Sequence, residues 1–521
     1  MKAKTGKNQK SGFERFLGGV ERIGNKLPAP MFMFLILTVV VIVISGIGGI
    51  FDWSVTGQMM NRASGQIEET TIEVVSLCTP EGIKYMLSSF VNNFATYPSL
   101  GNGLIIMMGI ALAEYSGWLN VLIKKAVQLT PAKLVTPAVV LIGVLTNITE
   151  WAGYFLFVPL AGMIFKSCGK HPLAGIAAAL AGVAGGFSAN FAIGSVDVIL
   201  AGFSQTAAQT LDPTYTVSPL ANWYFMFVST IFLTVVGTFV TEKIVIPHLG
   251  EYHYNGEGEA PSEVIEFTDD EKKAMRTANW VFLLLIVGLV AICIPENSFM
   301  REPETGSLME GSLLVEAIIP ILTIIFSVPG LVYGHIVKKI NNSHDMAAAM
   351  KTGVDTMASF VVITMFSAQF IRYFGYSNLG RMLSMKGANF LKNLNVGVIP
   401  LMIVFILFSA FLNLFMASAS AKYAVFAPIF VPMFMELGIS PELTQIAYRI
   451  GDSISNPIAP VLAALPLILA TMKKYDKDSG MGTLLSCTLP FSIWFVIGWT
   501  IMLIVWMYAG LPFGPGAYPY L

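Results

Sequence analysis

Residues 447–460 read AYRIGDSISNPIAP, and strongly apolar stretches flank them on both sides, FAPIFVPMFMELG at 426–438 and VLAALPLILATM at 461–472. The stretch brings Arg449, Asp452 and Asn456 close together and ends in Pro457 and Pro460, which interrupt a helix. In hydrocarbon, such an interruption survives only where protein or a water-filled cavity surrounds its unpaired backbone groups. The stretch therefore predicts a broken helix that lines a site inside a membrane protein.

The composition of the whole chain supports a membrane protein. Of its 521 residues, 55% are hydrophobic and only 12% are charged, whereas soluble domains carry about 25% charged residues. A helical membrane span takes about 20 apolar residues. The clearest apolar segments are 31–50, 225–240, 280–293, 313–332, 396–415 and 491–508. We therefore expect an all-α polytopic membrane protein.

Several classes of function lack their sequence signals. The net charge is −1, which provides no basic field for nucleic acid. The four cysteines lie far apart without a CxxC motif, the five histidines form no HExxH, and no GxxxxGK[ST] phosphate loop is present. These observations argue against a disulfide framework, a zinc site and ATP-driven transport. We expect no catalytic residue and no cofactor other than a coupling ion.

The ends of the first span differ in charge. Residues 1–27 carry seven basic side chains and lead into a full-length span without a signal-peptide cleavage pattern. The next segment, 52–84, holds five acidic and two basic residues. By the positive-inside rule, we expect 1–27 to be a cytoplasmic N-terminal segment.

The chain repeats its own plan. YFLFVP at 154–159 matches YAVFAP at 423–428, and GGFSAN at 185–190 matches GDSISN at 451–456 in the same order. Such matched, interrupted segments are typical of transporters built from inverted repeats. The repeat predicts a first membrane half at 28–245 with a re-entrant hairpin near 146–165, and a second at 278–521 with a hairpin near 414–436. The charged stretch 246–277 is expected to be a solvated linker between them.

The polar residues of these breaks are candidates for ion binding. Broken helices expose half-helix ends that attract anions and unwound carbonyls that attract cations. Asn147, Asn190 and Asn456 carry side-chain carbonyls suited to Na⁺. The alternative is that they only form hydrogen bonds between helices.

Ionisable residues at membrane depth are rare and usually functional. Arg449 and Asp452 are three residues apart, so they share a helix face and are able to pair. In the functional interpretation Arg449 neutralises a substrate carboxylate, while Asp452 or Asp197 titrates or coordinates a cation. Lys422 and Glu150 lie near the predicted hairpin tips, where a solvated role and a binding role are both open.

One catalytic alternative uses Asp197 and Asp452 as the two carboxylates of an intramembrane aspartyl hydrolase. Such enzymes carry a GxGD pattern, but here Asp452 follows Arg449-Ile450-Gly451 and lacks the first glycine. Arg449 would also lower the pKa of the carboxyl group that holds the shared proton.

Several stretches together resemble the AbgT family of p-aminobenzoyl-glutamate transporters. They are VERIGNKLPAP at 20–30, GKHPLAGIAAALAGVAGGFSAN at 169–190, VDVILAG at 196–202, SASAKYAVFAPIFVPMF at 418–434 and the opening stretch. The resemblance implies a homodimer in the bacterial inner membrane, with about nine transmembrane helices and two re-entrant helical hairpins per subunit. It also implies either uptake of p-aminobenzoyl-glutamate, which links the family to folate metabolism, or export of sulfonamide antimetabolites. Transport would be symport or antiport driven by a gradient of H⁺ or Na⁺.

The resemblance also implies a set of substrate-binding residues. Carried over position by position, they are Asp197, Asn413, Ser420, Tyr423, Pro441, Arg449, Asp452 and Pro460, with Asp197 and Asp452 coupling the ion. Two positions depart from the family pattern. Tyr423 stands where a tryptophan is expected, and Glu150 stands where a small polar residue is expected. A tyrosine keeps an aromatic face for an aryl amide and adds a hydroxyl.

Overall fold

The structure is a computed structural model that describes residues 30–61, 66–148, 153–254, 267–308, 311–394, 396–416, 418–460, 462 and 464–521. In this part of the chain, seven helices are long and apolar enough to cross a membrane. An eighth is added if residues 118–148, which bend by 111°, form one broken span. The prediction of an all-α polytopic membrane protein is confirmed. The expected nine spans require at least one shorter apolar helix to cross as well.

In the described residues up to 254, ten α-helices follow one another, with short 3₁₀ and π-helical turns between some of them. The α-helices are α2 (Pro30–Ile50), α3 (Pro80–Ala95), α4 (Pro98–Ser116), α5 (Trp118–Gln128), α6 (Val135–Leu145), α7 (Val158–Ser167), α8 (Pro172–Leu180), α9 (Ser195–Ala208), α10 (Trp223–Val240) and α11 (Ile246–Leu249). The turns are η1 (Ala132–Leu134), η2 (Thr146–Ile148), η3 (Gly153–Phe157), η4 (Ala181–Gly185) and η5 (Thr241–Val245). The predicted hairpin near 146–165 falls on η2, η3 and α7; its re-entrant course stays a prediction.

The second half is likewise helical. Its helices are α12 (Asp269–Cys293), α13 (Leu313–Glu316), α14 (Ile318–Ile336), α15 (Ser343–Tyr376), α16 (Leu379–Asn393), α17 (Val398–Asn413), α18 (Ala419–Met435), α19 (Pro441–Ser455), α20 (Leu465–Lys473) and α21 (Met481–Tyr508), with the 3₁₀ turn η6 (Asn456–Ile458) after α19. The predicted hairpin near 414–436 falls on α18, and the opening stretch forms the end of α19 and η6.

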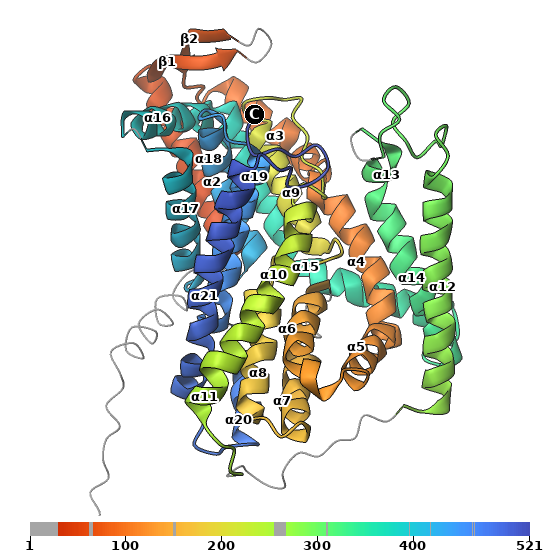
Figure 1. Ribbon diagram of the computed structural model, residues 1–521. Helices are drawn as coiled ribbons and strands as arrows, with labels where there is room; N and C mark the ends of the chain where they lie inside the picture. The colour runs from red at the N-terminus through yellow and green to blue at the C-terminus, as the bar shows by residue number, and fades with distance from the viewer. Residues whose placement is uncertain are drawn as a thin grey trace, which may run out of the picture.

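A β-hairpin that was not predicted from the sequence follows the first span. Strand β1 (Ser54–Asn61) pairs antiparallel with β2 (Gln66–Glu73). The sequence of β2, QIEETTIE, contains β-branched residues that favour strands, and Thr56 and Thr71 bond across the ladder at 2.8 Å. Ile72 packs on Met382 and Met385 of α16, and Figure 1 shows the hairpin at the same end of the molecule as α16.

The charged run that was assigned to the linker begins a helix. Residues 269–277 form the first turns of α12, because Thr268 and Glu271 make a capping box. Glu271 N donates to Thr268 Oγ1 at 3.2 Å, and Thr268 N donates to Glu271 Oε2 at 2.8 Å. Three acids in the first turn also suit the positive end of the helix dipole.

Helix α15 does not coincide with any of the clearest apolar segments of the sequence. It is one continuous helix of 34 residues that qualifies as a span. Its N-terminus is capped by Asn342, whose side chain accepts from Asp345 N at 3.0 Å. The polar residues of its first half are spread along the helix, so a window of 18 residues stays apolar.

Two groups of helices stand apart in Figure 1, with α12, α13 and α14 on one side and α10, α17, α18 and α21 on the other. Helices α14 and α15 pack on α4, and α19 packs against α17, α18, α21 and α9. Every residue of α8 and of α19 is buried. The interrupted segments of both halves therefore form the centre of the molecule.

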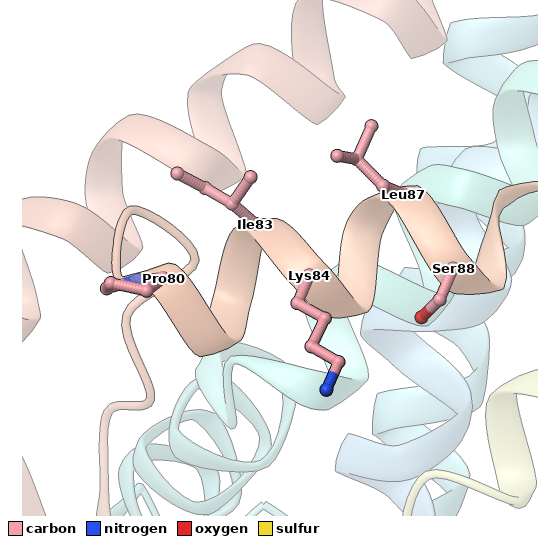
Figure 2. Close-up of a pocket in the computed structure, with 5 residues that line it drawn as sticks. All are labelled: Pro80, Ile83, Lys84, Leu87 and Ser88. Carbon is pink, nitrogen blue, oxygen red and sulfur yellow. The ribbon is translucent and has the colours of Figure 1, made fainter.

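Helix α3 lies at the periphery. Its outer face exposes Ile83 and Leu87 beside a shallow groove of about 720 Å³ whose other lining residues are Pro80, Lys84 and Ser88 (Figure 2). Its inner face bonds to α15, where Tyr373 donates to Met86 O at 3.1 Å. We expect the exposed apolar face to border lipid.

Candidate substrate and ion site

Helix α19 is buried on all sides and carries polar side chains on two of its faces. Pro441 stands at its first position, and the Ser440 hydroxyl caps it by accepting from Leu443 N at 3.1 Å. Gly451 allows close packing, since a Cβ there would lie 2.4 Å from Ile406 O on α17. Buried polar groups cost free energy unless they are hydrogen-bonded, so every polar residue of α19 needs a partner on a neighbouring helix.

One face of α19 pairs with the first half of the chain. Arg449 Nη1 lies 2.7 Å from Asp197 Oδ1, and both side chains are almost completely buried. Asp197 sits in the first turn of α9, where its Oδ2 accepts from Gly194 N at 2.7 Å. The helix terminus thus positions the carboxylate, and the ion pair joins the two halves at the centre of the protein.

The other face of α19 carries a second ion pair. Asp452 Oδ1 lies 2.7 Å from Nζ of Lys422 on α18. Lys422 is completely buried; its Nζ also donates to Asn413 Oδ1 and to Met416 O at 3.4 Å. The Tyr448 hydroxyl donates to Ala419 O at 2.6 Å and lies 3.5 Å from Asp452 Oδ1.

Two possibilities that the sequence left open are not realised in the structure. Arg449 and Asp452 do not pair with each other, because each finds its counter-charge on a different helix. Lys422 does not reach water, because α18 is packed between α9, α16 and α19. For Lys422 the sequence had left a solvated role and a binding role open. Its signal was a lysine within an apolar buried segment, since lysine is almost never fully buried unless it is paired.

A polar chain connects α9, α18 and α19 beside the Arg449–Asp197 pair. Ser204 donates its hydroxyl proton to Gln445 Oε1 at 2.7 Å, so the Tyr423 hydroxyl, also at 2.7 Å, donates to Ser204. The Tyr423 ring packs on the Tyr448 ring with centroids 4.5 Å apart. Sequence reasoning missed Ser204 and Gln445, which carry no signal of their own.

Replacing Tyr423 by phenylalanine tests this chain. The variant loses one buried hydrogen bond and keeps the aromatic face, so we expect a loss of about 1 kcal/mol in stability. Ser204→Ala should cost more, because it leaves both the Tyr423 hydroxyl and Gln445 Oε1 without a partner. Thermal unfolding of the two purified variants measures the order; equal stabilities would contradict the chain.

Asn413 fastens the broken end of α19. Its amide nitrogen lies 2.7 Å from Asp452 O, 2.9 Å from Ser455 Oγ and 2.7 Å from Asn456 Oδ1, while its carbonyl accepts from Lys422. The Asn413 side chain therefore links the Lys422–Asp452 pair to the break at the end of α19.

The two matched breaks contact each other directly. Ser188 N of the first break donates to Ser453 Oγ of the second at 3.1 Å. Asn456 donates to Ala184 O and Asn147 donates to Gly186 O, each at 3.2 Å. The Asn190 carbonyl accepts from its own loop, from Phe191 N at 2.8 Å. Asn147 and Asn456 thus lie at the same end of η4, whereas the Asn190 side chain is engaged locally; Na⁺ binding at the three stays a prediction.

The AbgT putative transporter family model matches residues 15–521. The chain belongs to the AbgT family. Over 507 residues, which cover 97% of both chains, it is 36% identical to the p-aminobenzoyl-glutamate transport protein of Escherichia coli (strain K12).

Two solved AbgT-family structures are similar to this one. The Alcanivorax borkumensis YdaH transporter, described as having an unusual topology, superposes with a TM-score of 0.88 at 35% identity over 94% of this chain and 100% of that chain. Neisseria gonorrhoeae MtrF, described as illuminating a class of antimetabolite efflux pumps, gives 0.88 at 41% identity over 96% and 100%.

This AbgT-family protein is a multi-pass membrane transporter and not an enzyme. The hydrolase alternative is therefore wrong. The geometry gives the physical reason: Asp197 and Asp452 each face a cation and belong to two separate ion pairs, so they do not share a proton as the carboxylates of an aspartyl hydrolase do.

The remaining predicted residues lie on or next to α18 and α19. Ser420 is half-buried, with its hydroxyl 3.4 Å from Ser418 Oγ, and is not hydrogen-bonded to either ion pair. Pro441 begins α19, and Pro460 is buried just after η6. Glu150 lies outside the described residues, as does the segment 1–27.

Proposed function

We propose that this transporter moves p-aminobenzoyl-glutamate or a related aromatic carboxylate, driven by an ion gradient. The observation that carries the proposal is the incomplete pairing of Arg449. Its Nε is buried and has no hydrogen-bond partner, and the Asp197 contact is made through Nη1. A guanidinium has five donors and binds carboxylates with two parallel bonds. A substrate carboxylate would complete this pairing.

The aromatic residues beside Arg449 support an aryl substrate. The rings of Tyr423 and Tyr448 pack against each other at a tilt next to the ion pairs, and the Phe426 ring centroid lies 5.7 Å from that of Tyr448. An aryl amide gains from stacking on such rings. The E. coli relative's name supports p-aminobenzoyl-glutamate as the leading substrate, and the description of MtrF supports export of antimetabolites as a second direction.

The Lys422–Asp452 pair supports coupling to an ion. Asp452 Oδ1, Asn413 Oδ1 and Met416 O surround the Lys422 ammonium as oxygen ligands would surround a cation. A proton arriving at Asp452, or Na⁺ arriving at these oxygens, would release Lys422 and free α18 from α19. Asp197 would be affected by the same ion through Arg449, its partner on the other face of α19. Ion binding on one face of α19 would thereby change substrate binding on the other face.

The membrane setting completes the proposal. We place the protein in the bacterial inner membrane as a homodimer, with residues 1–27 cytoplasmic by the positive-inside rule. The two segments that contain the breaks would move together against α4, α14 and α15 during alternating access. The net direction of transport would follow the imposed gradients.

Replacing the ion tests this proposal. Proteoliposomes should accumulate labelled p-aminobenzoyl-glutamate only under an imposed gradient. If Na⁺ is the coupling ion, replacing it by choline at fixed pH abolishes accumulation; if H⁺ is, a protonophore does so while choline has no effect. Gradient-independent equilibration without accumulation would contradict secondary active transport.

A further inference from the structure

A cavity lies at one end of the molecule, and none of its described lining residues belongs to the two ion pairs of α19. Its volume is about 480 Å³, and its walls come from α4, α13 and α14 as well as from α9, α19 and the segments 216–221 and 515–517. Figure 1 shows α13 and the C-terminus at this end. Cavities that bind small molecules have volumes of about 300–1,000 Å³, so this cavity is large enough for a ligand.

Glu442 carries the buried charge of this cavity, since its side chain lines the cavity and the residue is only 5% exposed. The Tyr215 hydroxyl donates to Glu442 Oε2 at 3.0 Å, and the Ser440 hydroxyl and the N–H of Glu442 itself are further donors. These donors are neutral, and in the described residues no basic side chain forms an ion pair with Glu442. The N-terminus of α19 contributes about half a positive charge, which is less than a buried carboxylate requires.

Asn222 adds a buried acceptor without a donor. It follows Ala221, which lines the cavity, and its Nδ2 donates to the backbone carbonyl of Glu442 at 3.0 Å. This bond fixes the orientation of the amide and leaves Asn222 Oδ1 buried, with no hydrogen-bond partner in the part of the chain that the structure describes. Unpaired buried polar atoms are rare and indicate a missing partner. A carboxylate and an amide oxygen at this place therefore both lack a charged or neutral donor.

The rest of the lining is polar without being basic. Glu316 of α13 is exposed at the opening and has no ion pair among the described residues. The other polar lining residues carry amides and hydroxyls: Asn102, Gln205, Thr216 and Ser218. None of the described lining residues is lysine, arginine or histidine. Two carboxylates without a basic residue repel an anion such as p-aminobenzoyl-glutamate and favour a cation.

We propose that this cavity binds a small organic cation, with an ammonium group of the ligand at Glu442. An ammonium group has three N–H donors and no acceptor, so it supplies both the charge and the donors that are missing there. Val217, Val315 and Ile319 also line the cavity and provide apolar walls for the carbon chain of the ligand. A second ammonium group would reach Glu316 at the opening. The proposal does not rest on the proposed function.

An inorganic ion fits the cavity less well. Multidentate metal sites combine several charged or imidazole ligands around one point. The described residues contain no group of three or more His, Cys, Asp or Glu side chains that could hold a metal ion. A volume of about 480 Å³ also corresponds to about 16 water molecules at roughly 30 Å³ each, which is far more than one ion fills.

The test measures the Kd of putrescine, a diamine, by isothermal titration calorimetry of the full-length protein in nanodiscs of phosphatidylcholine. Butanediol, in which hydroxyls replace the ammonium groups, is the uncharged control, and Ca²⁺ is the inorganic control. The matched control variant is Glu81→Gln. Glu81 is exposed and follows a capping threonine and a proline at the start of α3, as Glu442 follows Ser440 and Pro441.

We expect putrescine to bind the wild type and butanediol not to bind, because only putrescine carries a positive charge. Glu442→Gln should raise the Kd of putrescine about tenfold or more, since hydrogen bonds to a buried charged partner are lost. Glu316→Gln should raise the Kd by a smaller factor, because exposed ion pairs contribute little. Glu81→Gln should leave it unchanged.

Three results would overturn the proposal. They are no binding of putrescine to the wild type at millimolar concentration, the same Kd for Glu442→Gln and Glu81→Gln, and Glu442-dependent binding of Ca²⁺ without binding of putrescine. If Glu442→Gln does not fold, Val315→Phe takes its place, because it fills the cavity from α13 without changing a charge. Weaker putrescine binding to Val315→Phe then supports the proposal, and an unchanged Kd overturns it.

Discussion

Replacing Lys422 by methionine, with Asp452 left in place, is expected to destabilise the protein by about 3–5 kcal/mol. The reason is that Asp452 is only 2% exposed and would keep a buried negative charge without its counter-ion. The Tyr448 hydroxyl, 3.5 Å away and already donating to Ala419 O, compensates poorly. Thermal unfolding of the purified protein measures the loss.

Two further variants give this prediction its controls. Adding Asp452→Asn to Lys422→Met removes the stranded charge, so most of the stability should return while gradient-driven transport stays absent. Lys170→Met breaks the partly exposed pair with Glu242, and we expect it to cost only about 1 kcal/mol or less. A Lys422→Met variant as stable as Lys170→Met would contradict the buried pair.

Replacing Arg449 by glutamine is expected to lower kcat/KM for p-aminobenzoyl-glutamate about 30-fold or more, as for the loss of one partner of a buried charge pair. Arg449 would lose its bonds to the substrate carboxylate, and Asp197 would be left buried opposite a neutral amide. Flux measurements in proteoliposomes give the ratio.

The stability effect of this change must be separated from the binding effect. Arg449→Gln combined with Asp197→Asn removes both charges and should fold better than the single variant. Because the substrate would still lack its arginine, the double variant should remain as poor a transporter as Arg449→Gln. Transport restored in the double variant would show that Arg449 acts only as the counter-ion of Asp197.

The membrane class and the two matched breaks were predictable from the sequence. Long apolar segments with 12% charged residues leave few alternatives to a polytopic membrane protein. The matched breaks at 185–190 and 451–456 could be found because glycine, asparagine and proline rarely occur together within an apolar segment. The structure brings these two breaks into contact through Ser188 and Ser453.

The pairing of the charges was not predictable. The three-residue spacing of Arg449 and Asp452 suggested a local pair, but the packing of α9 and α18 against opposite faces of α19 supplied each with a distant partner. Lys422 looked like a residue at a hairpin tip, because its burial depends on helices far away in the sequence. The β-hairpin at 54–73 was hidden by its polar composition.

The most direct test of the central claim is a double-variant cycle between Arg449 and the substrate carboxylates. The Kd values of p-aminobenzoyl-glutamate and of an analogue with both carboxylates converted to amides are measured for the wild type and for Arg449→Gln. We expect a loss of affinity of about 30-fold or more with the analogue in the wild type and a much smaller loss in the variant. Equal losses in the two proteins would show that Arg449 does not bind the substrate carboxylate.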